Sequence, residues 1–355
     1  MQPSLATHPF QSLLESAFAS HGPNFSRKAA LFRYWASTAL AQQEPMSIAS
    51  KRNPVAHPLI RSNTRRPQVT HQPSGPIAYK LSLRANSPHR PFADRDFCVY
   101  AWRTLQDLFP EVIAAVLMPN HLHITAWPAS PESNSKNELT DLLRQFQRRM
   151  SFKLPKSVRE NYWEPIYPPE GIPDPFHLQR QIRYVHLNPC RRSLCRDPLG
   201  WEWSTHRDYV GAIANPWPER ERVFKLLTYP SGDRGLERFH CYISSDPSVS
   251  LVGTHLPRQA GDSVVLLNLS AAEKAAALAL RIPATEIRRK GRTRHLVLGS
   301  IQNTFIIRKN KIAQHFGVHP SSIRTLDKPD IDELALGKAI GMTLMDSRLL
   351  GEFES

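Results

Sequence analysis

The sequence predicts an α+β fold, in which an antiparallel sheet carries helices on one face and a small all-α domain follows. Apolar and polar residues alternate in the first segment after residue 72, which is typical of a half-buried strand. Two more strand-like runs are joined by a Pro-Asn pair, which favours a turn. The segments around them have apolar residues at helical spacing. The order strand, helix, two strands, helix, helix indicates an antiparallel sheet with helices packed on it.

The strand and helix segments follow one another without long gaps. Residues 77–86 alternate in polarity, with Tyr79 and Leu81 on the apolar side, and residues 94–109 have helical spacing. Residues 137–154 form an amphipathic pattern. The next helix begins at Asp174, a plausible N-cap that is followed by proline at the first helical position. The two strands that meet at the Pro-Asn turn cover residues 111–119 and 121–127.

Composition limits the class of protein. The chain has 355 residues, which suits two domains plus tails, and it is 41% hydrophobic, so a core can form. The net charge of +15 indicates a polyanionic partner, nucleic acid before a membrane, although a merely basic surface is the alternative. We find no apolar run long enough to span a membrane and no secretory signal at the start, and we expect no membrane partner.

The chain has four cysteines, Cys98, Cys190, Cys195 and Cys241. None of them forms a Cys-x-x-Cys pair, which argues against a zinc ribbon or a redox motif. We expect ordinary reduced cysteines in a cytoplasmic protein.

The composition changes along the chain divide it into five parts. The first is a basic tail, rich in Pro and Ser, that we expect to be disordered or to follow from a start codon placed too far upstream. A domain with the ordered α+β signal comes next, then a helical extension with a linker, a helical domain and a short tail. These parts cover residues 1–72, 73–211, 212–262, 263–345 and 346–355.

Two histidines stand one residue apart in the strand-like run "VLMPNHLHITAW". In a strand, the side chains of His121, His123 and Thr125 share one face, and the residues between them face the core. Two imidazoles side by side on an open sheet face indicate part of a metal site. With 15 histidines in the chain, such a pair arises by chance about as often as not, so two partly exposed histidines are the alternative.

The segment "QIRYVHLNP" supplies further candidates. Tyr184 and Asn188 are four residues apart and share a face of a helix. Pro189 is expected to end this helix at Asn188, which leaves the amide oxygen free to bind a hard divalent cation beside the imidazoles. Tyr184 could attack a phosphorus centre and hold a covalent intermediate. The alternative for Tyr184 is a core tyrosine with its hydroxyl at the surface.

The motifs "LMPNHLHI", "RYVHLNPCRRSL" and "WEWSTHRDYVG", in this order, resemble the REP-associated branch of the single-tyrosine HUH transposases, in the insertion-sequence-200-like family. HUH stands for His-hydrophobic-His, here His121-Leu122-His123. The resemblance covers residues from about 75 to 211, together with the helical extension that follows. It implies a ferredoxin-like HUH domain in which His121, His123 and Asn188 bind Mg²⁺ or Mn²⁺. It also implies that Tyr184 attacks single-stranded DNA and leaves a 5′-phosphotyrosine link and a free 3′-hydroxyl.

Some residues depart from the family pattern. The segment from Pro165 to Pro175 contains five prolines, counting both ends, where relatives have a more regular strand and an acidic turn. Cys190 and Ser193 replace a more typical valine and glycine. The candidate metal ligands and nucleophile, His121, His123, Asn188 and Tyr184, are all present. Any difference from the relatives is therefore expected in how DNA is positioned.

Basic residues gather in two places of the α+β domain. Such clusters can follow phosphates, with a solvated basic face as the alternative. For Trp201 and Trp203, which could stack on bases, packing in the core is favoured. The candidate DNA-binding residues are Arg144, Arg148 and Arg149 on one helix, and Arg180, Arg183, Arg191 and Arg192 around Tyr184.

The segment "KIAQHFGVHPSSIRTL" resembles a helix-turn-helix. Gly317 would make the turn, and the recognition helix would open at His319. Ser321, Ser322 and Arg324 would then reach a major groove. An ordinary αα-hairpin is the alternative.

The leading hypothesis is a metal-dependent DNA transposase that cleaves and rejoins single-stranded DNA at hairpin-flanked, REP-like sites. The C-terminal domain would add duplex recognition, and the protein would act as a monomer or homodimer on the nucleoid of a bacterial cytoplasm. One alternative is a catalytically inactive DNA-binding regulator with the same fold. Another is a phosphodiesterase that uses water in place of tyrosine.

Overall fold

The computed structural model describes residues 75–128, 135–256, 268–323 and 330–351. All of them belong to one compact unit, Thr70–Ser355. The tail expected over residues 1–72 lies outside the described residues. Among the helices that the structure describes, none is long and apolar enough to cross a membrane.

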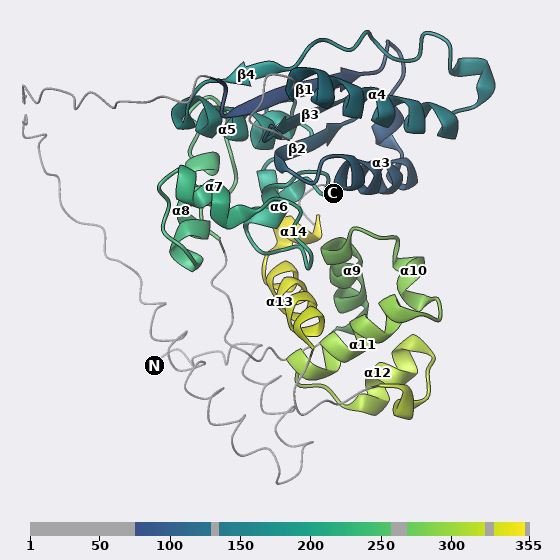
Figure 1. Ribbon diagram of the computed structural model, residues 1–355. Coiled ribbons are helices and arrows are strands. Elements are labelled where there is room, and N and C mark those ends of the chain that lie inside the picture. The colour runs from purple at the N-terminus through teal and green to yellow at the C-terminus, as the bar shows by residue number, and fades with distance from the viewer. Residues whose placement is uncertain (1–74, 129–134, 257–267, 324–329, 352–355) are drawn as a thin grey trace, which may run out of the picture. The chain divides into compact units, whose positions relative to one another are not determined.

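The centre of the fold is a four-stranded antiparallel sheet in the order β2-β3-β1-β4 (Figure 1). Its strands are β1 (Ala78–Arg84), β2 (Val112–Met118), β3 (His121–Ala126) and β4 (Glu170–Ile172). With its helices, the sheet gives an α+β fold, as the sequence predicts, and it is compatible with a ferredoxin-like domain.

The turn between β2 and β3 fixes where the two histidines lie. Met118 pairs with His121, so Pro119 and Asn120 alone connect the strands, and this part of the prediction is confirmed. The carbonyl oxygen of Asn120 accepts a hydrogen bond of 2.8 Å from the amide of Ala85. A tight turn of this kind sets the register, and with it the face on which every side chain of β3 lies.

Helices cover both faces of the sheet, which corrects the expectation of one covered face. One face packs on α3 (Arg95–Leu108) and α4 (Ser135–Lys153), with Trp102 and Phe146 fully buried. The other face packs on α5 (Pro175–Arg191), α7 (Arg220–Leu226) and α8 (Asp233–Ser244). All seven residues of β2 are buried, because its continuous apolar run suits a strand that is covered on both sides.

The two tryptophans of the "WEWS" segment pack against the sheet, as the sequence favoured. Trp203 is 7% exposed and its ring centroid lies 6.1 Å from that of Trp102. The indole of Trp201 donates a hydrogen bond of 2.9 Å to the carbonyl oxygen of Leu117.

Helix α5 begins as predicted and ends later than predicted. The side chain of Asp174 accepts a hydrogen bond from the amide of His177, and Pro175 occupies the first turn. Pro189 lies inside the helix, which continues to Arg191, so the prediction that it ends at Asn188 is wrong. Asn188 and Pro189 are both buried, and this burial stabilises the last turn despite the missing amide hydrogen.

The C-terminal helices enclose a separate apolar cluster. They are α9 (Leu269–Leu280), α10 (Ala284–Arg288), α11 (Arg292–Thr304), α12 (Lys309–Phe316), α13 (Ile331–Met345) and α14 (Ser347–Leu350). Gly317 ends α12 in the left-handed region, with φ of 61°, as expected for the turn. After it the chain makes only a 3-10 turn, Pro320–Ser322, and residues 324–329 are not described. The helix-turn-helix is therefore not confirmed.

Two arginines, Arg281, which is buried, and Arg348, which is 11% exposed, connect the C-terminal helices to the sheet domain. Arg281, directly after α9, donates to the carboxylate of Asp208 at 2.7 Å and to the carbonyl oxygen of Ser204 at 2.7 Å. Arg348, in α14, lies 3.0 Å from a carboxylate oxygen of Asp197. Such pairs need close geometry to offset desolvation, so each fixes the position of one helix end.

Candidate functional site

His121 and His123 lie on one face of β3, as the strand alternation predicts. Their ring centroids are 4.9 Å apart and the planes are nearly perpendicular, at 82°. His121 is 6% exposed and His123 is half-buried. Nδ1 of His121 is 2.8 Å from the side-chain oxygen of Asn120, a contact that orients the ring.

Both imidazoles are held in the neutral form. Burial lowers the pKa of His121 to about 3, with smaller contributions from His123, Arg84 and Arg192. Burial also lowers the pKa of His123 to about 4, assisted by Arg84 and Lys80. A neutral imidazole keeps a lone pair on one ring nitrogen, which is the form that ligates metal ions.

Tyr184 projects from α5 beside these histidines. Its ring centroid is 5.4 Å from that of His123, with the planes at 72°. The tyrosine is 42% exposed, although it is flanked along α5 by buried residues such as Val185. The guanidinium of Arg191 lies 5.6 Å from the centre of its ring. The structure thus brings a solvent-accessible phenol, a neutral imidazole and a cation together.

Asn188 lies one helical turn after Tyr184 and is 4% exposed. Its backbone oxygen accepts a hydrogen bond from the amide of Arg192, which caps the helix. Among the described residues, no side-chain hydrogen bond of Asn188 is present. The amide is therefore on the same helix as the tyrosine and keeps its oxygen uncommitted.

The two imidazoles are the donors that the structure brings together for a divalent cation. Within the described ranges, no group of three or more His, Cys, Asp or Glu residues is placed to hold a metal ion. His121 and His123 give two neutral nitrogen ligands, and the amide oxygen of Asn188 would be the third. The amide oxygen suits Mg²⁺ and Mn²⁺, which keep further positions for water or phosphate oxygens, whereas the two imidazoles are softer ligands of the kind that transition metals prefer.

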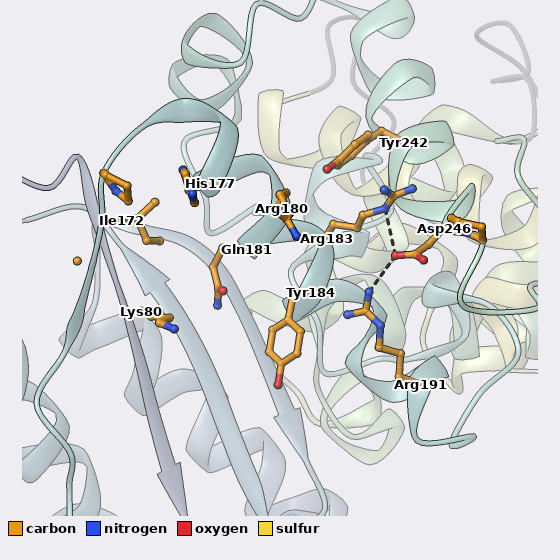
Figure 2. Close-up of a pocket in the computed structure, with 13 residues that line it drawn as sticks. Lys80, Ile172, His177, Arg180, Gln181, Arg183, Tyr184, Arg191, Tyr242 and Asp246 are labelled. Atoms are coloured by element: carbon orange, nitrogen blue, oxygen red, sulfur yellow. Dashed lines mark hydrogen bonds and ion pairs between the residues drawn. The ribbon is translucent and has the colours of Figure 1, made fainter. Parts of the chain in front are cut away.

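Two cavities meet at Tyr184. One, of about 350 Å³, extends toward His123 and the exposed ring of Tyr167. The other, of about 790 Å³, lies between α5 and the segment that follows α8 (Figure 2). Lys80, Gln181 and Tyr184 line both cavities. A linear substrate could therefore occupy both sides of the tyrosine at once.

The larger cavity contains most of the arginines predicted near Tyr184. Arg180, Arg183 and Arg191 line it, and Arg183 and Arg191 both approach one carboxylate, Asp246 (Figure 2). Arg192 is exposed at the end of α5 and lines neither cavity. Its positive charge instead contributes to the lowered pKa of His121.

The other predicted DNA-binding residues lie away from Tyr184. Arg144, Arg148 and Arg149 are exposed on α4, and Arg144 and Arg148 line a cavity of about 610 Å³ with Tyr162 and Trp163. Arg144 pairs with Asp141 at 2.8 Å, and Arg149 lies 3.9 Å from Asp107. In the C-terminal helices, Ser321 and Ser322 are exposed in the 3-10 turn, and Arg324 lies outside the described residues.

Sequence reasoning missed several residues of the site. Gln181 is three residues before Tyr184 on α5, a helical spacing that could have identified it. Lys80 lies on the polar side of β1 and pairs with Glu170 at 2.6 Å. Tyr242 and Asp246 come from the segment at and after α8, and no sequence signal connects them to Tyr184.

Comparison with known proteins gives a structural match at low similarity. No family model and no curated protein matches this chain. A solved structure of a REP-associated tyrosine transposase bound to a REP hairpin matches with a TM-score of 0.30 and 16% identity. The match covers 54% of this chain and 99% of that chain. At this level it does not establish the family of this chain.

Proposed function

We propose that this protein is a transposase of the single-tyrosine HUH type, which cleaves and rejoins single-stranded DNA through a covalent bond to Tyr184. Hairpin-flanked sites of the REP kind are the proposed targets. The motif resemblance of residues 75 to 211 motivates the proposal, and the geometry around Tyr184 supports it.

One observation carries the proposal. The ring of Tyr184 faces that of His123 at 5.4 Å, and His121 is the next side chain on the same face of β3. A core tyrosine would bury its ring, whereas this one is 42% exposed beside two cavities. The pairing of an accessible phenol with two neutral imidazoles suits attack on a bound phosphodiester.

The reaction conserves the number of phosphodiester bonds. The oxygen of Tyr184 forms a bond to the phosphorus as the bond from phosphorus to the 3′-oxygen breaks. The phenol loses its proton and the leaving 3′-oxygen takes one up, so the products are a 5′-phosphotyrosine and a free 3′-hydroxyl. Attack by a 3′-hydroxyl on the phosphotyrosine rejoins DNA, so the cycle needs no external energy source.

His121, His123 and Asn188 would hold the divalent cation, Mg²⁺ or Mn²⁺. When bound, this ion would act as a Lewis acid on the scissile phosphate. The chain itself orients the reaction: Asn120 fixes the ring of His121, and α5 carries the nucleophile on one face with Gln181. Lys80 and Arg191 place positive charge on either side of the phenol.

The test is a denaturing gel with single-stranded hairpin DNA taken from beside the protein's own gene and labelled on either side of the cut. We expect the strand 3′ of the cut to shift to a protein adduct with Mg²⁺ or Mn²⁺, and not with chelator. The variant Tyr184→Phe should form no adduct. Tyr167→Phe is the matched control, because Tyr167 lines the same cavity and is 68% exposed.

Other outcomes would support the alternatives. An adduct in Tyr184→Phe would remove Tyr184 as the nucleophile. Cleavage that leaves free 5′-phosphate ends would indicate a hydrolase that uses water. Specific duplex binding without cleavage under any metal would indicate a regulator.

A further inference from the structure

The larger cavity beside Tyr184 has one wall from outside the predicted catalytic domain. Arg180, Arg183 and Arg191 come from α5, whereas Tyr242 and Asp246 come from the end of α8 and the segment after it. Its volume of about 790 Å³ lies within the range of roughly 300–1,000 Å³ that is typical of small-ligand sites. The helical extension therefore takes part in the cavity and is not only a connector.

The charges in this cavity favour an anion. Four side chains with positive charge line it, namely Lys80, Arg180, Arg183 and Arg191, against the single carboxylate of Asp246. Lys80 is paired with Glu170, and Arg183 and Arg191 share Asp246, so these three cations are oriented by acidic partners. Oriented cations with further N–H donors match the oxygens of a phosphodiester.

Asp246 is itself held in place. Its Oδ1 accepts hydrogen bonds from the amide of Ser248 at 2.9 Å and from the hydroxyl of Ser248 at 2.5 Å. Its Oδ2 lies 2.9 Å from Nη2 of Arg191 and 3.4 Å from Nε of Arg183 (Figure 2). Burial raises the pKa of Asp246, but Ser248 and the two arginines outweigh it and leave the pKa below its usual value.

The two guanidiniums are also fixed from their other sides. The guanidinium carbon of Arg183 lies 4.3 Å from the ring centre of Tyr242, and that of Arg191 lies 5.6 Å from the ring centre of Tyr184. One carboxylate oxygen and two aromatic rings thus set the spacing of two cations directly beside the proposed nucleophile.

We propose that this cavity binds an unpaired nucleotide of single-stranded DNA next to the phosphodiester at Tyr184. Arg183 and Arg191 bind the phosphate, and Asp246 is the positioning residue that sets their spacing. The inference rests on the proposed function for the identity of the ligand, and it assigns to the helical extension a direct part in binding substrate.

The test measures binding alone, with chelator present, so that it does not depend on cleavage. The probe is a short fluorescein-labelled oligothymidylate, and the readout is anisotropy over a series of salt concentrations. The double variant Arg183→Gln, Arg191→Gln should bind about tenfold more weakly or worse. Its plot of log affinity against log salt should be shallower by about 0.7 for each DNA phosphate that the variant no longer neutralises.

A matched double variant removes the same charge elsewhere. Arg103→Gln, Arg292→Gln also lowers the net charge by two, and neither residue lines either cavity at Tyr184. It should leave the affinity and the salt slope close to those of the wild type. Equal losses of affinity in the two double variants would overturn the inference, because general charge would then explain binding.

The sign of the effect of Asp246→Asn separates positioning from charge. Loss of a negative charge would strengthen DNA binding by electrostatics alone, whereas loss of the positioning carboxylate should weaken it several-fold. In the double variant Arg183→Gln, Arg191→Gln, the additional change Asp246→Asn should not alter DNA binding further. If Asp246 had a purely structural role, Asp246→Asn would weaken binding in that double variant as well. Tighter binding of the single variant would overturn the positioning role.

If Asp246→Asn fails to fold, Asp246→Glu is the variant that tests the positioning role. It keeps the charge and moves the carboxylate by one methylene, so binding should weaken at unchanged net charge, and wild-type binding would contradict the spacing argument. The proposed function can fail separately: a missing tyrosine adduct together with weakened binding of the cavity variants would remove the transposase and keep the binding site. A tyrosine adduct together with unchanged binding of the cavity variants would keep the transposase and remove the binding site.

Discussion

The ring centroid of His123, on β3, lies 5.4 Å from that of Tyr184, on α5. The two residues are far apart in the sequence and meet because α5 packs on the face of the sheet that carries the histidines. This contact connects the candidate metal ligands to the candidate nucleophile, and the first prediction follows from it.

Removal of either imidazole should stop cleavage more than it weakens DNA binding. We expect His121→Ala and His123→Ala to lower metal-dependent adduct formation on the order of 100-fold or more, because a bound cation stabilises the transition state by several kcal/mol. Oligonucleotide affinity in chelator should change little. The control is His295→Ala, an exposed histidine of α11. Full adduct formation in His123→Ala would contradict the ligand role.

Arg281 and Asp208 form a buried ion pair, so their contributions to the free energy of unfolding should be strongly coupled. The side chains are 5% and 0% exposed, and the guanidinium also lies 4.4 Å from the ring centre of Trp102. Arg281→Met should lower the free energy of unfolding by about 3–5 kcal/mol, because it leaves a buried carboxylate without its cation. Urea unfolding measures this decrease.

Two further variants check the coupling. Combining Arg281→Met with Asp208→Asn should cost less than the sum of the two single changes. Arg103→Met is the exposed comparison, since Arg103 pairs with Glu286 at the surface and its replacement should cost only ~0–1 kcal/mol. Additive costs for the buried pair would contradict the coupling.

Three buried histidines outside the candidate metal site should make the protein less stable in weak acid. Burial lowers the pKa of His186 and of His240 to about 3 and holds that of His206 well below its usual value. The unfolded chain therefore binds more protons than the folded one below about pH 6.5. The free energy of unfolding should keep its full value above that pH. At lower pH it should decrease, by up to about 1.4 kcal/mol per pH unit for each histidine.

Urea unfolding over a pH series measures this slope. His240→Gln should make the slope shallower by the contribution of one histidine, because a glutamine does not take up a proton. His295→Gln should leave the slope unchanged, since His295 is exposed. An unchanged slope in His240→Gln would show that other groups cause the acid sensitivity.

Two glycines should respond to alanine in opposite directions. A Cβ at Gly235 in α8 would lie 1.9 Å from the backbone oxygen of Pro230 and 3.1 Å from the ring of Phe224. Gly235→Ala should lower the free energy of unfolding by about 1–3 kcal/mol through overpacking. Gly341 in α13 has no atom within 4 Å of such a Cβ, so Gly341→Ala should stabilise by about 0.5–1 kcal/mol. Thermal melting of the two variants compares these signs.

Local sequence patterns determined several structural features of this protein. Alternation along β3 placed His121 and His123 on one face, and the Pro119–Asn120 pair set the hairpin. The capping residue Asp174 set the start of α5. These features depend on residues close together in the sequence, and backbone geometry decides them before any distant contact forms.

Long-range packing decided the rest. The sequence did not show that α5 continues through Pro189, because burial of that turn outweighs the local cost of the proline. The continuous apolar run of β2 was one local sign that helices cover both faces of the sheet, but the helices that cover them were not evident from it. No local pattern indicated Asp246, which meets Arg183 and Arg191 only because the segment after α8 folds back beside α5. Such contacts come from the burial of apolar surface between distant elements, which is not directional and leaves no local pattern.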